Sequence, residues 1–172
     1  MTAAQAQFQL DHPGVADGAA IWRIARDSKV LDLNSSYSYL LWCRDFAGTS
    51  VVARDETGEV AGFVTGYIRP ERPGTLVVWQ VAVDHGHRGH GLAAALLDGL
   101  TEKVRASGRP VTTVETTITP DNTASQALFL SYARRHAAGV QRQVLFDAGL
   151  FPDDGHLPEE LYLIGPLAPA AG

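Results

Sequence analysis

The chain has 172 residues, of which 45% are hydrophobic, and this is enough for one globular domain with a substantial core. Its 14 basic and 19 acidic residues give a formal net charge of −5, and no basic stripe is interleaved with aromatic residues, so nucleic-acid binding is disfavoured. The single cysteine, Cys43, excludes an internal disulfide, and no apolar run is long enough to span a membrane. We expect one cytoplasmic domain over residues 1–172, with residues 1–7 and 167–172 frayed.

The first part of the chain predicts a short strand at 8–10, two helices and a hairpin. Asp17 is placed to cap the first helix and Ser36 to cap the second. Apolar residues recur at helical spacing after each cap: Ile21, Trp22, Ile24 and Ala25 in the first helix, and Leu40, Leu41, Trp42 and Phe46 in the second. Residues 50–53 and 60–68 are predicted strands, and the Asp-Glu-Thr-Gly sequence between them indicates a tight turn.

The remainder of the chain alternates between strands and helices. A turn at 70–74 leads into a strand at 77–83, a glycine-rich turn and a helix that begins at Leu92. A strand at 111–118 is followed by a helix that opens after Asn122. The chain then predicts a strand at 140–146, a polar segment at 152–160 and a last strand at 161–164. The predicted order is β-α-α-β-β-β-α-β-α-β-β.

The turn at 84–91, with sequence Asp-His-Gly-His-Arg-Gly-His-Gly, has the composition of an anion site. Glycines at 89 and 91 allow a phosphate to approach the main chain, and the helix that follows offers unpaired N–H groups and the positive end of its dipole. A nucleotide P-loop is excluded because no Lys-Ser/Thr pair follows, and the dinucleotide fingerprint is matched only in part. The alternate histidines suggest a metal only weakly, since no carboxylate pair accompanies them.

Two motifs carry a resemblance to the GCN5-related N-acetyltransferases. The pattern Arg-x-x-Gly-x-Ala from Arg88 to Ala93, after a strand ending in Val-x-Val-Asp, resembles their acetyl-CoA pyrophosphate loop. The segment from Asn122 to Phe129 resembles their Asn-x-x-Ala-x-x-Leu-Tyr segment. The resemblance implies an α/β (α+β) fold whose central mixed sheet splays between two parallel strands, here those ending at Val83 and Ile118, and is flanked by helices. It implies acetyl-CoA as co-substrate, no metal, and a cofactor site made of Val81, Val83, Arg88, Gly89, His90, Gly91, Leu92, Ala93, Asn122, Ser125 and Phe129.

One position departs from the pattern of the family. Many members carry a tyrosine that protonates the departing thiolate, and this chain has Phe129 there. Tyr132 would replace it only if the helix were rotated. A thiol with a pKa of about 8.5 is an adequate leaving group with little help from an acid, so catalysis does not require the tyrosine.

The acceptor site is predicted from the variable parts of the fold. These hold Asp32, Asn34, Tyr37, Trp79, His156 and Glu159. Two carboxylates, two aromatic rings and a histidine suit a small cation, which they bind through charge-assisted hydrogen bonds and cation–π contacts. Residues 30–39, 78–84 and 161–166 resemble one branch of the family that acetylates a small diamino acid; the resemblance implies a homodimer and no membrane partner.

Each of these residues also has a structural interpretation. Trp79 on a central strand is typical of a core, and Asp32 with Asn34 could cap helices. Tyr37 could lie in the first turn of a helix, and the loop residues His156 and Glu159 could be solvated. A further carboxylate, Glu115, is either a base acting through water or a partner of an arginine.

The predicted mechanism is direct transfer in a ternary complex. Asp32 and Glu159 bind ammonium groups, Tyr37 and Trp79 form walls, and His156 or Glu115 accepts the proton. Three other functions stay open: acetylation of another diamine or polyamine, acetylation of a protein N-terminus, and CoA binding without catalysis.

Overall fold

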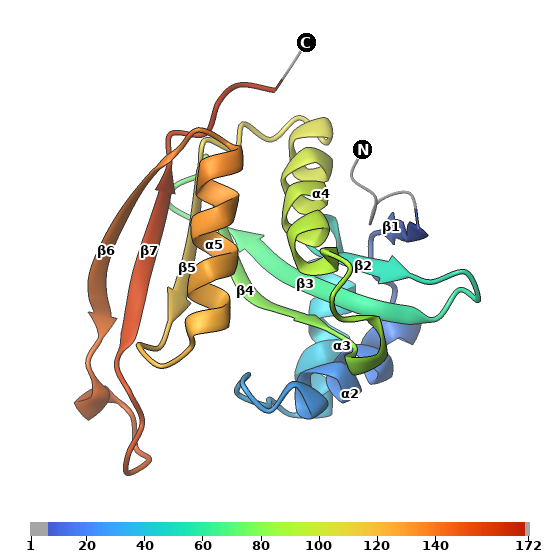
Figure 1. Ribbon diagram of the computed structural model, residues 1–172, viewed down its shortest axis with the longest axis horizontal. Coiled ribbons are helices and arrows are strands. Elements are labelled where there is room, and N and C mark those ends of the chain that lie inside the picture. Colours follow the sequence, from blue (N-terminus) through green and yellow to red (C-terminus); the bar gives the residue numbers. More distant parts are fainter. Residues whose placement is uncertain (1–6, 171–172) are drawn as a thin grey trace.

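The computed structural model describes residues 7–170 and is built on one mixed sheet with helices on both faces (Figure 1). The strands are β1 (Gln9–Asp11), β2 (Val51–Arg54), β3 (Val60–Ile68), β4 (Thr75–Val83), β5 (Thr113–Ile118), β6 (Gly139–Phe146) and β7 (Glu159–Gly165). The helices are α2 (Gly18–Ser28), α3 (Ser36–Asp45), α4 (Leu92–Ala106) and α5 (Thr123–Arg135), with short 3₁₀ turns at Val15–Asp17, Ala47–Thr49, His85–His87 and Ala148–Leu150. The predicted order of strands and helices is confirmed.

The strands of the sheet lie in the order β1-β2-β3-β4-β5-β7-β6. Neighbouring strands are antiparallel except for β4 and β5, which are parallel. These are the two strands that were predicted to be parallel, since β4 ends at Val83 and β5 ends at Ile118.

The parallel pair is joined over only three positions. Its register runs from Thr75 opposite Thr113 to Val77 opposite Glu115, and pairing stops there. Beyond this point the Thr116 hydroxyl donates to the Val78 carbonyl at 3.2 Å, and the two strands then diverge (Figure 1). The predicted splay is confirmed, and it leaves the β5-facing main-chain groups of β4 around Val81 and Val83 without a strand partner among residues 7–170.

A β-bulge in β4 lies at the point of divergence. Thr65 of β3 is opposite Gln80, and the next residue, Gly66, is opposite Val78, so Trp79 is the additional residue. Gly66 is required here because a Cβ at this position would lie 2.6 Å from the Val77 carbonyl oxygen. The bulge turns two consecutive side chains, Trp79 and Gln80, towards α2 and α3.

Two hydrophobic cores lie on opposite faces of the sheet. Helices α4 and α5 cover one face and bury Leu96 and Phe129 against it, whereas α2 and α3 cover the other and bury Ile21 and Tyr39 (Figure 1). The Cys43 thiol lies in the second core, and burial raises its pKa to about 11, so this side chain has a packing role. Within residues 7–170, no helix has both the length and the apolar character needed to cross a membrane.

Three local predictions require correction. Asp17 does not cap α2, because its carboxylate accepts the Gly14 N–H at 2.8 Å and pairs with Arg54 at 2.9 Å. The cap of α3 is Ser35, one residue before the predicted one. Leu167, expected in a frayed tail, is buried, and its N–H donates to the Thr112 carbonyl at 2.8 Å. The rest of the predicted frayed ends lies partly outside the described residues, at 1–6 and 171–172.

Candidate active site

The glycine-rich turn between β4 and α4 presents open main chain. Gly89 and Gly91 have φ angles of +84° and +72°, in the left-handed region that favours glycine. A Cβ at either position would meet no atom within 4 Å, so this main chain faces open space. Helix α4 begins directly after Gly91, and its first main-chain hydrogen bond runs from the Ala95 N–H to the Gly91 carbonyl. The N–H groups that precede Ala95 in the first turn are therefore available to an anion, at the positive end of the helix dipole.

Other side chains hold this turn in place. The Asp84 carboxylate accepts the Gly86 N–H and lies 3.2 Å from His87 Nδ1. His87 Nε2 lies 3.5 Å from an Asp55 carboxylate oxygen in the β2–β3 turn. His87 therefore fixes the turn to the neighbouring hairpin, whereas Arg88 and His90 are exposed beside the two glycines. The side chain of Leu92 is buried in the core, so this residue can offer a ligand only its main chain.

The second motif lies at the start of α5. The Asn122 Oδ1 accepts the Ser125 N–H at 3.1 Å and caps the helix, which explains this spacing without a ligand. The Asn122 side chain also lines a cavity, whereas Phe129 is 2% exposed and packs in the core. Tyr132, one turn later, is buried and its hydroxyl is hydrogen-bonded to Thr101 at 2.7 Å. Burial raises the pKa of Tyr132 to about 12.

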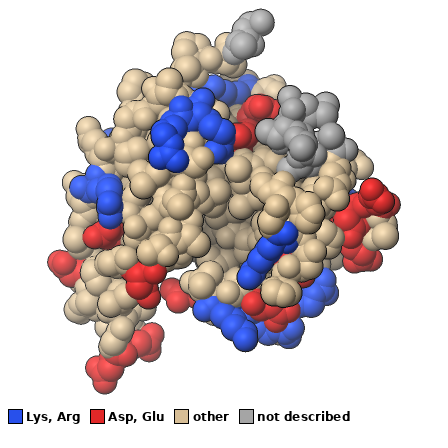
Figure 2. All heavy atoms as spheres, viewed as in Figure 1, with Lys and Arg blue, Asp and Glu red and all other residues tan. Residues whose placement is uncertain are grey.

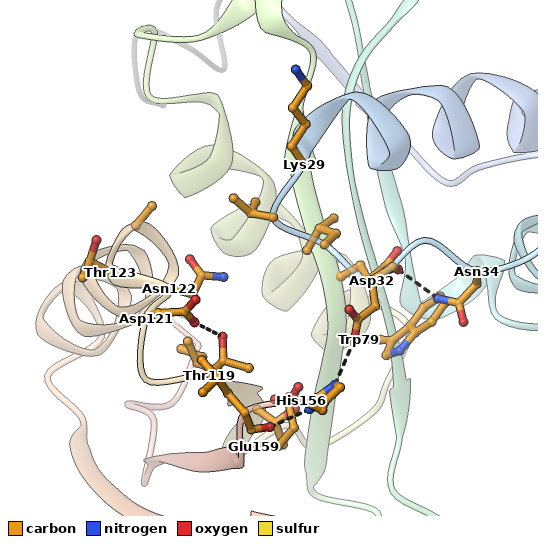
Figure 3. A pocket seen from close by; sticks show the side chains of 17 residues that line it. Lys29, Asp32, Asn34, Trp79, Thr119, Asp121, Asn122, Thr123, His156 and Glu159 are labelled. Atoms are coloured by element: carbon orange, nitrogen blue, oxygen red, sulfur yellow. Dashed lines mark hydrogen bonds and ion pairs between the residues drawn. The ribbon is translucent and has the colours of Figure 1, made fainter. Parts of the chain in front are cut away.

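A cavity of about 580 Å³ opens beside the splayed strands. The α2–α3 segment, the bulge of β4, the start of α5 and the loop before β7 form its walls (Figure 3). In the space-filling view the molecule is hollowed near the middle of this face, with basic and acidic side chains around it (Figure 2). The polar and aromatic side chains of its lining are Lys29, Asp32, Asn34, Trp79, Gln80, Thr117, Thr119, Asp121, Asn122, Thr123, His156 and Glu159.

Five of the six predicted acceptor residues line this cavity: Asp32, Asn34, Trp79, His156 and Glu159. Tyr37 does not line it, because it lies in the first turn of α3 with 65% of its surface exposed. Glu115 does not line it either. That carboxylate is buried and accepts a hydrogen bond from Arg69 at 3.2 Å, which matches the alternative in which it pairs with an arginine.

Asp32, His156 and Glu159 form a compact cluster at the mouth of the cavity. Each side chain contributes one nitrogen or carboxylate oxygen atom, and these three atoms all lie within 4.8 Å of one another. His156 Nε2 lies 3.6 Å from an Asp32 carboxylate oxygen, and the same ring stacks on Phe151 with centroids 3.6 Å apart. Two carboxylates and an imidazole at this spacing can hold an ammonium group and exchange a proton with it.

The histidine of this cluster is oriented by the main chain. His156 Nδ1 lies 2.6 Å from the Leu157 carbonyl oxygen, an arrangement that requires a proton on Nδ1. In the neutral ring Nε2 is then the proton acceptor, and it faces Asp32. The Leu157 carbonyl, followed by the Asp32 carboxylate, raises the pKa of His156 above its ordinary value.

Glu159 lies deeper than Asp32. Burial, followed by the neighbouring charge of Asp32, raises the pKa of Glu159 above its ordinary value, while Thr117 and His156 act in the opposite direction. The Asp32 side chain is 84% exposed. The two carboxylates therefore offer one partly desolvated and one solvated partner to a cation.

Trp79 lies between the cavity and the second core. It lines the cavity, and its ring stacks on Trp42 with centroids 4.6 Å apart and planes inclined by 9°. Several residues of the lining were not predicted from the sequence, and among them Gln80, the neighbour of Trp79, is buried and also reaches the cavity. An isolated amide inside an apolar strand was the available signal.

Comparisons with known proteins show which family the chain belongs to. Residues 19–132 match the model of the Acetyltransferase (GNAT) family. The L-2,4-diaminobutyric acid acetyltransferase of Streptomyces anulatus is 66% identical, over 98% of this chain and 99% of that protein. The protein of the same name from Marinococcus halophilus is 47% identical, over 91% of this chain and 88% of that protein.

A comparison with solved structures finds a similar fold in a protein with the same enzyme name. Diaminobutyrate acetyltransferase EctA from Paenibacillus lautus, in complex with L-2,4-diaminobutyric acid and coenzyme A, superposes with a TM-score of 0.86 at 38% identity. The match covers 96% of this chain and 99% of that one. Together with the splayed sheet and the open glycine turn, these matches show that the chain belongs to the GNAT family of acetyltransferases.

Proposed function

We propose that this protein transfers the acetyl group of acetyl-CoA to the 4-amino group of L-2,4-diaminobutyrate, giving N4-acetyl-L-2,4-diaminobutyrate for ectoine synthesis. The observation that carries the proposal is the Asp32–His156–Glu159 cluster beside the splayed end of β4. Relatives with this activity in their names, at up to 66% identity over nearly the whole chain, support the same substrate.

Acetyl-CoA fits the residues on the opposite side of the splay. The open main chain at Gly89 and Gly91 and the first turn of α4 would hold its diphosphate, with Arg88 beside them. The amides of its pantetheine arm would pair with the free edge of β4 near Val81 and Val83. Acetyl-CoA bound in this way would have its thioester at the bulge of β4, next to the cavity that Trp79 lines.

The acceptor is a small amino acid with two ammonium groups and one carboxylate, and the ammonium group that reacts must lose a proton. Asp32 and Glu159 bind its ammonium groups, and the face of Trp79 adds a cation–π contact. An alkylammonium has a pKa of about 10 in water, so the site must remove a proton before attack. His156 Nε2 is the group we assign to that step, because Nδ1 is committed to the Leu157 carbonyl.

The remaining chemistry uses the main chain and the leaving group. A β4 N–H near Val81 would stabilise the negative charge that develops on the thioester oxygen. Tyr132 is committed to Thr101 in the core, and Phe129 has no acidic proton, so neither is assigned as the acid for the thiolate. A thiolate with a conjugate pKa of about 8.5 leaves without one.

The amine acceptor can be identified by following thiol release from acetyl-CoA with a panel of amines. We expect rapid release with L-2,4-diaminobutyrate and much slower release with ornithine, lysine, putrescine and a peptide N-terminus, because the cavity is small and its mouth carries the two carboxylates Asp32 and Glu159. Mass and NMR analysis of the product should place the acetyl group on the 4-amino nitrogen. Faster release with another amine would replace the assigned substrate, and tight CoA binding without any release would favour a non-catalytic module.

The two carboxylates are tested by Asp32→Asn and Glu159→Gln. Each substitution should raise the KM for diaminobutyrate by more than about tenfold, equivalent to about 1.4 kcal/mol, because a charged partner of the ammonium is lost. The KM for acetyl-CoA should stay nearly constant. Asp27→Asn is the matched control, since Asp27 is an exposed carboxylate that pairs with Arg26 on α2. If both variants keep the wild-type KM for diaminobutyrate, the acceptor assignment is wrong.

The role of His156 predicts an acid limb in the pH profile of kcat/KM. Neutral His156 is the active form, and its pKa is raised, so activity should fall as the pH drops through a value above the ordinary 6.5 or so of histidine. Asp32→Asn removes a charge that favours the imidazolium, so the limb should move to lower pH. Titration of the substrate amine is common to both profiles and cancels in their comparison. A limb that stays in place after Asp32→Asn, or survives His156→Ala, contradicts the assignment.

The proposal includes a homodimer that forms through β6. This strand is last in the sheet, and no strand within residues 7–170 pairs with its outer edge. Val144, Leu145 and Phe146 on it are 50%, 42% and 45% exposed, and Leu150 just beyond is 70% exposed. Such an apolar edge is a usual site of association. The same proposal places the protein in the cytoplasm, because acetyl-CoA is available there and the single thiol needs no oxidising compartment.

The dimer is tested by Phe146→Asp, which puts a charge into the proposed interface. Light scattering after gel filtration should give a dimer for the wild type and a monomer for this variant. Val15→Asp is the control, because Val15 is 52% exposed but lies on the turn before α2. A wild-type monomer at micromolar concentration, or a dimer that survives Phe146→Asp, would show that β6 does not form the interface.

A further inference from the structure

We propose that Gln80 is a positioning residue for the acceptor site: its buried side chain fixes the main chain at Asp32 and so sets where the Asp32 carboxylate meets the substrate ammonium. This inference rests on the proposed function, in which Asp32 binds the acceptor. It adds a residue that makes no proposed contact with the reacting atoms.

The amide of Gln80 bridges two elements that are distant in the sequence. Gln80 Nε2 donates to the Asp32 carbonyl oxygen at 2.8 Å, and Gln80 Oε1 accepts a hydrogen bond from the Tyr39 hydroxyl at 3.0 Å. Gln80 is 5% exposed and Tyr39 is fully buried. A buried amide with its donor and acceptor both used is costly to disturb, because a lost partner leaves a polar group unsatisfied.

The bulge of β4 explains why Gln80 can make this bridge. In a regular strand, consecutive side chains point to opposite faces of the sheet. Here the additional residue Trp79 brings Gln80 to the same side as α2 and α3, where Tyr39 lies. Residue 80 would otherwise face the α4 and α5 side, away from the segment that carries Asp32.

The Asp32 side chain depends on its main chain for its position. It is 84% exposed, and one of its carboxylate oxygens lies 3.6 Å from His156 Nε2. Residues 29–35 between α2 and α3 have no helix or strand. The Asp32 carbonyl accepts from Gln80 and, at 3.2 Å, from Asn34 Nδ2, but Asn34 belongs to the same exposed segment. Gln80 therefore supplies the bond that ties this segment to the sheet next to the thioester path.

Gln80→Glu is the most informative substitution. A carboxylate still accepts from Tyr39, but it places an acceptor against the Asp32 carbonyl and breaks that bond. We expect the KM for diaminobutyrate to rise about tenfold and the KM for acetyl-CoA to stay within about twofold. Gln80→Met removes both hydrogen bonds while keeping a similar side-chain volume, and it should change the two KM values in the same way. This variant tests the proposal if the buried charge of Gln80→Glu prevents folding. Gln9→Glu, on exposed β1, is the control for the added charge.

A double-mutant cycle separates positioning from a general structural effect. If Gln80 acts through Asp32, then Gln80→Glu should add less than about twofold to the KM for diaminobutyrate in an Asp32→Ala background. Full additivity of the two changes overturns the proposal, and so does an equal rise of both KM values. An Asp32→Ala variant with wild-type KM would instead overturn the acceptor assignment, and with it the route through Asp32.

Hydrogen exchange supplies a readout that needs no turnover. Amides of residues 29–35 should exchange faster in Gln80→Glu and Gln80→Met than in the wild type or in Gln9→Glu, because the segment loses its bond to the sheet. Unchanged exchange there overturns the proposal even if activity falls. Faster exchange in a protein that does not acetylate diaminobutyrate would leave the positioning of the segment supported and the proposed function refuted.

Discussion

The site depends on one constraint, the early end of the pairing between β4 and β5. Main-chain N–H and C=O groups need partners, and a parallel pair that stops at Val77 and Glu115 leaves one edge of β4 without them. A ligand with amides in an extended arm would satisfy that edge, and this is the role proposed above for the pantetheine arm of acetyl-CoA.

The bulge at Trp79 determines which side chains of β4 face the proposed acceptor site. It brings two neighbouring side chains to one face, where Trp79 becomes a wall supported by Trp42 and Gln80 anchors the segment of Asp32. The close approach that the bulge needs is possible because Gly66 has no Cβ. A main-chain irregularity thus determines how two side chains of the cavity, Trp79 and Gln80, are placed.

Much of this could be predicted from the sequence, and the exceptions have identifiable causes. Apolar spacing defined the strands and helices, and the glycine-rich sequence before α4 indicated the open main chain found at Gly89 and Gly91. The role of Glu115 could not be decided from the sequence, because its partner Arg69 lies 46 residues earlier, in the turn after β3, and so distant a contact leaves no local pattern. Tyr37 was placed in the acceptor site, but as the second residue of a helix capped by Ser35 it points to solvent. Gln80 was missed because a bulge changes which face a residue occupies.

The stacked pair of Trp42 and Trp79 has a consequence beyond packing. The chain contains three tryptophans, and two of them lie with ring centroids 4.6 Å apart and nearly parallel. Indoles this close share their excited state, so the emission and near-ultraviolet dichroism of the pair respond when either ring is disturbed. Because one of the two forms a wall of the cavity, the protein has an intrinsic optical signal for whatever occupies that space, with no added label.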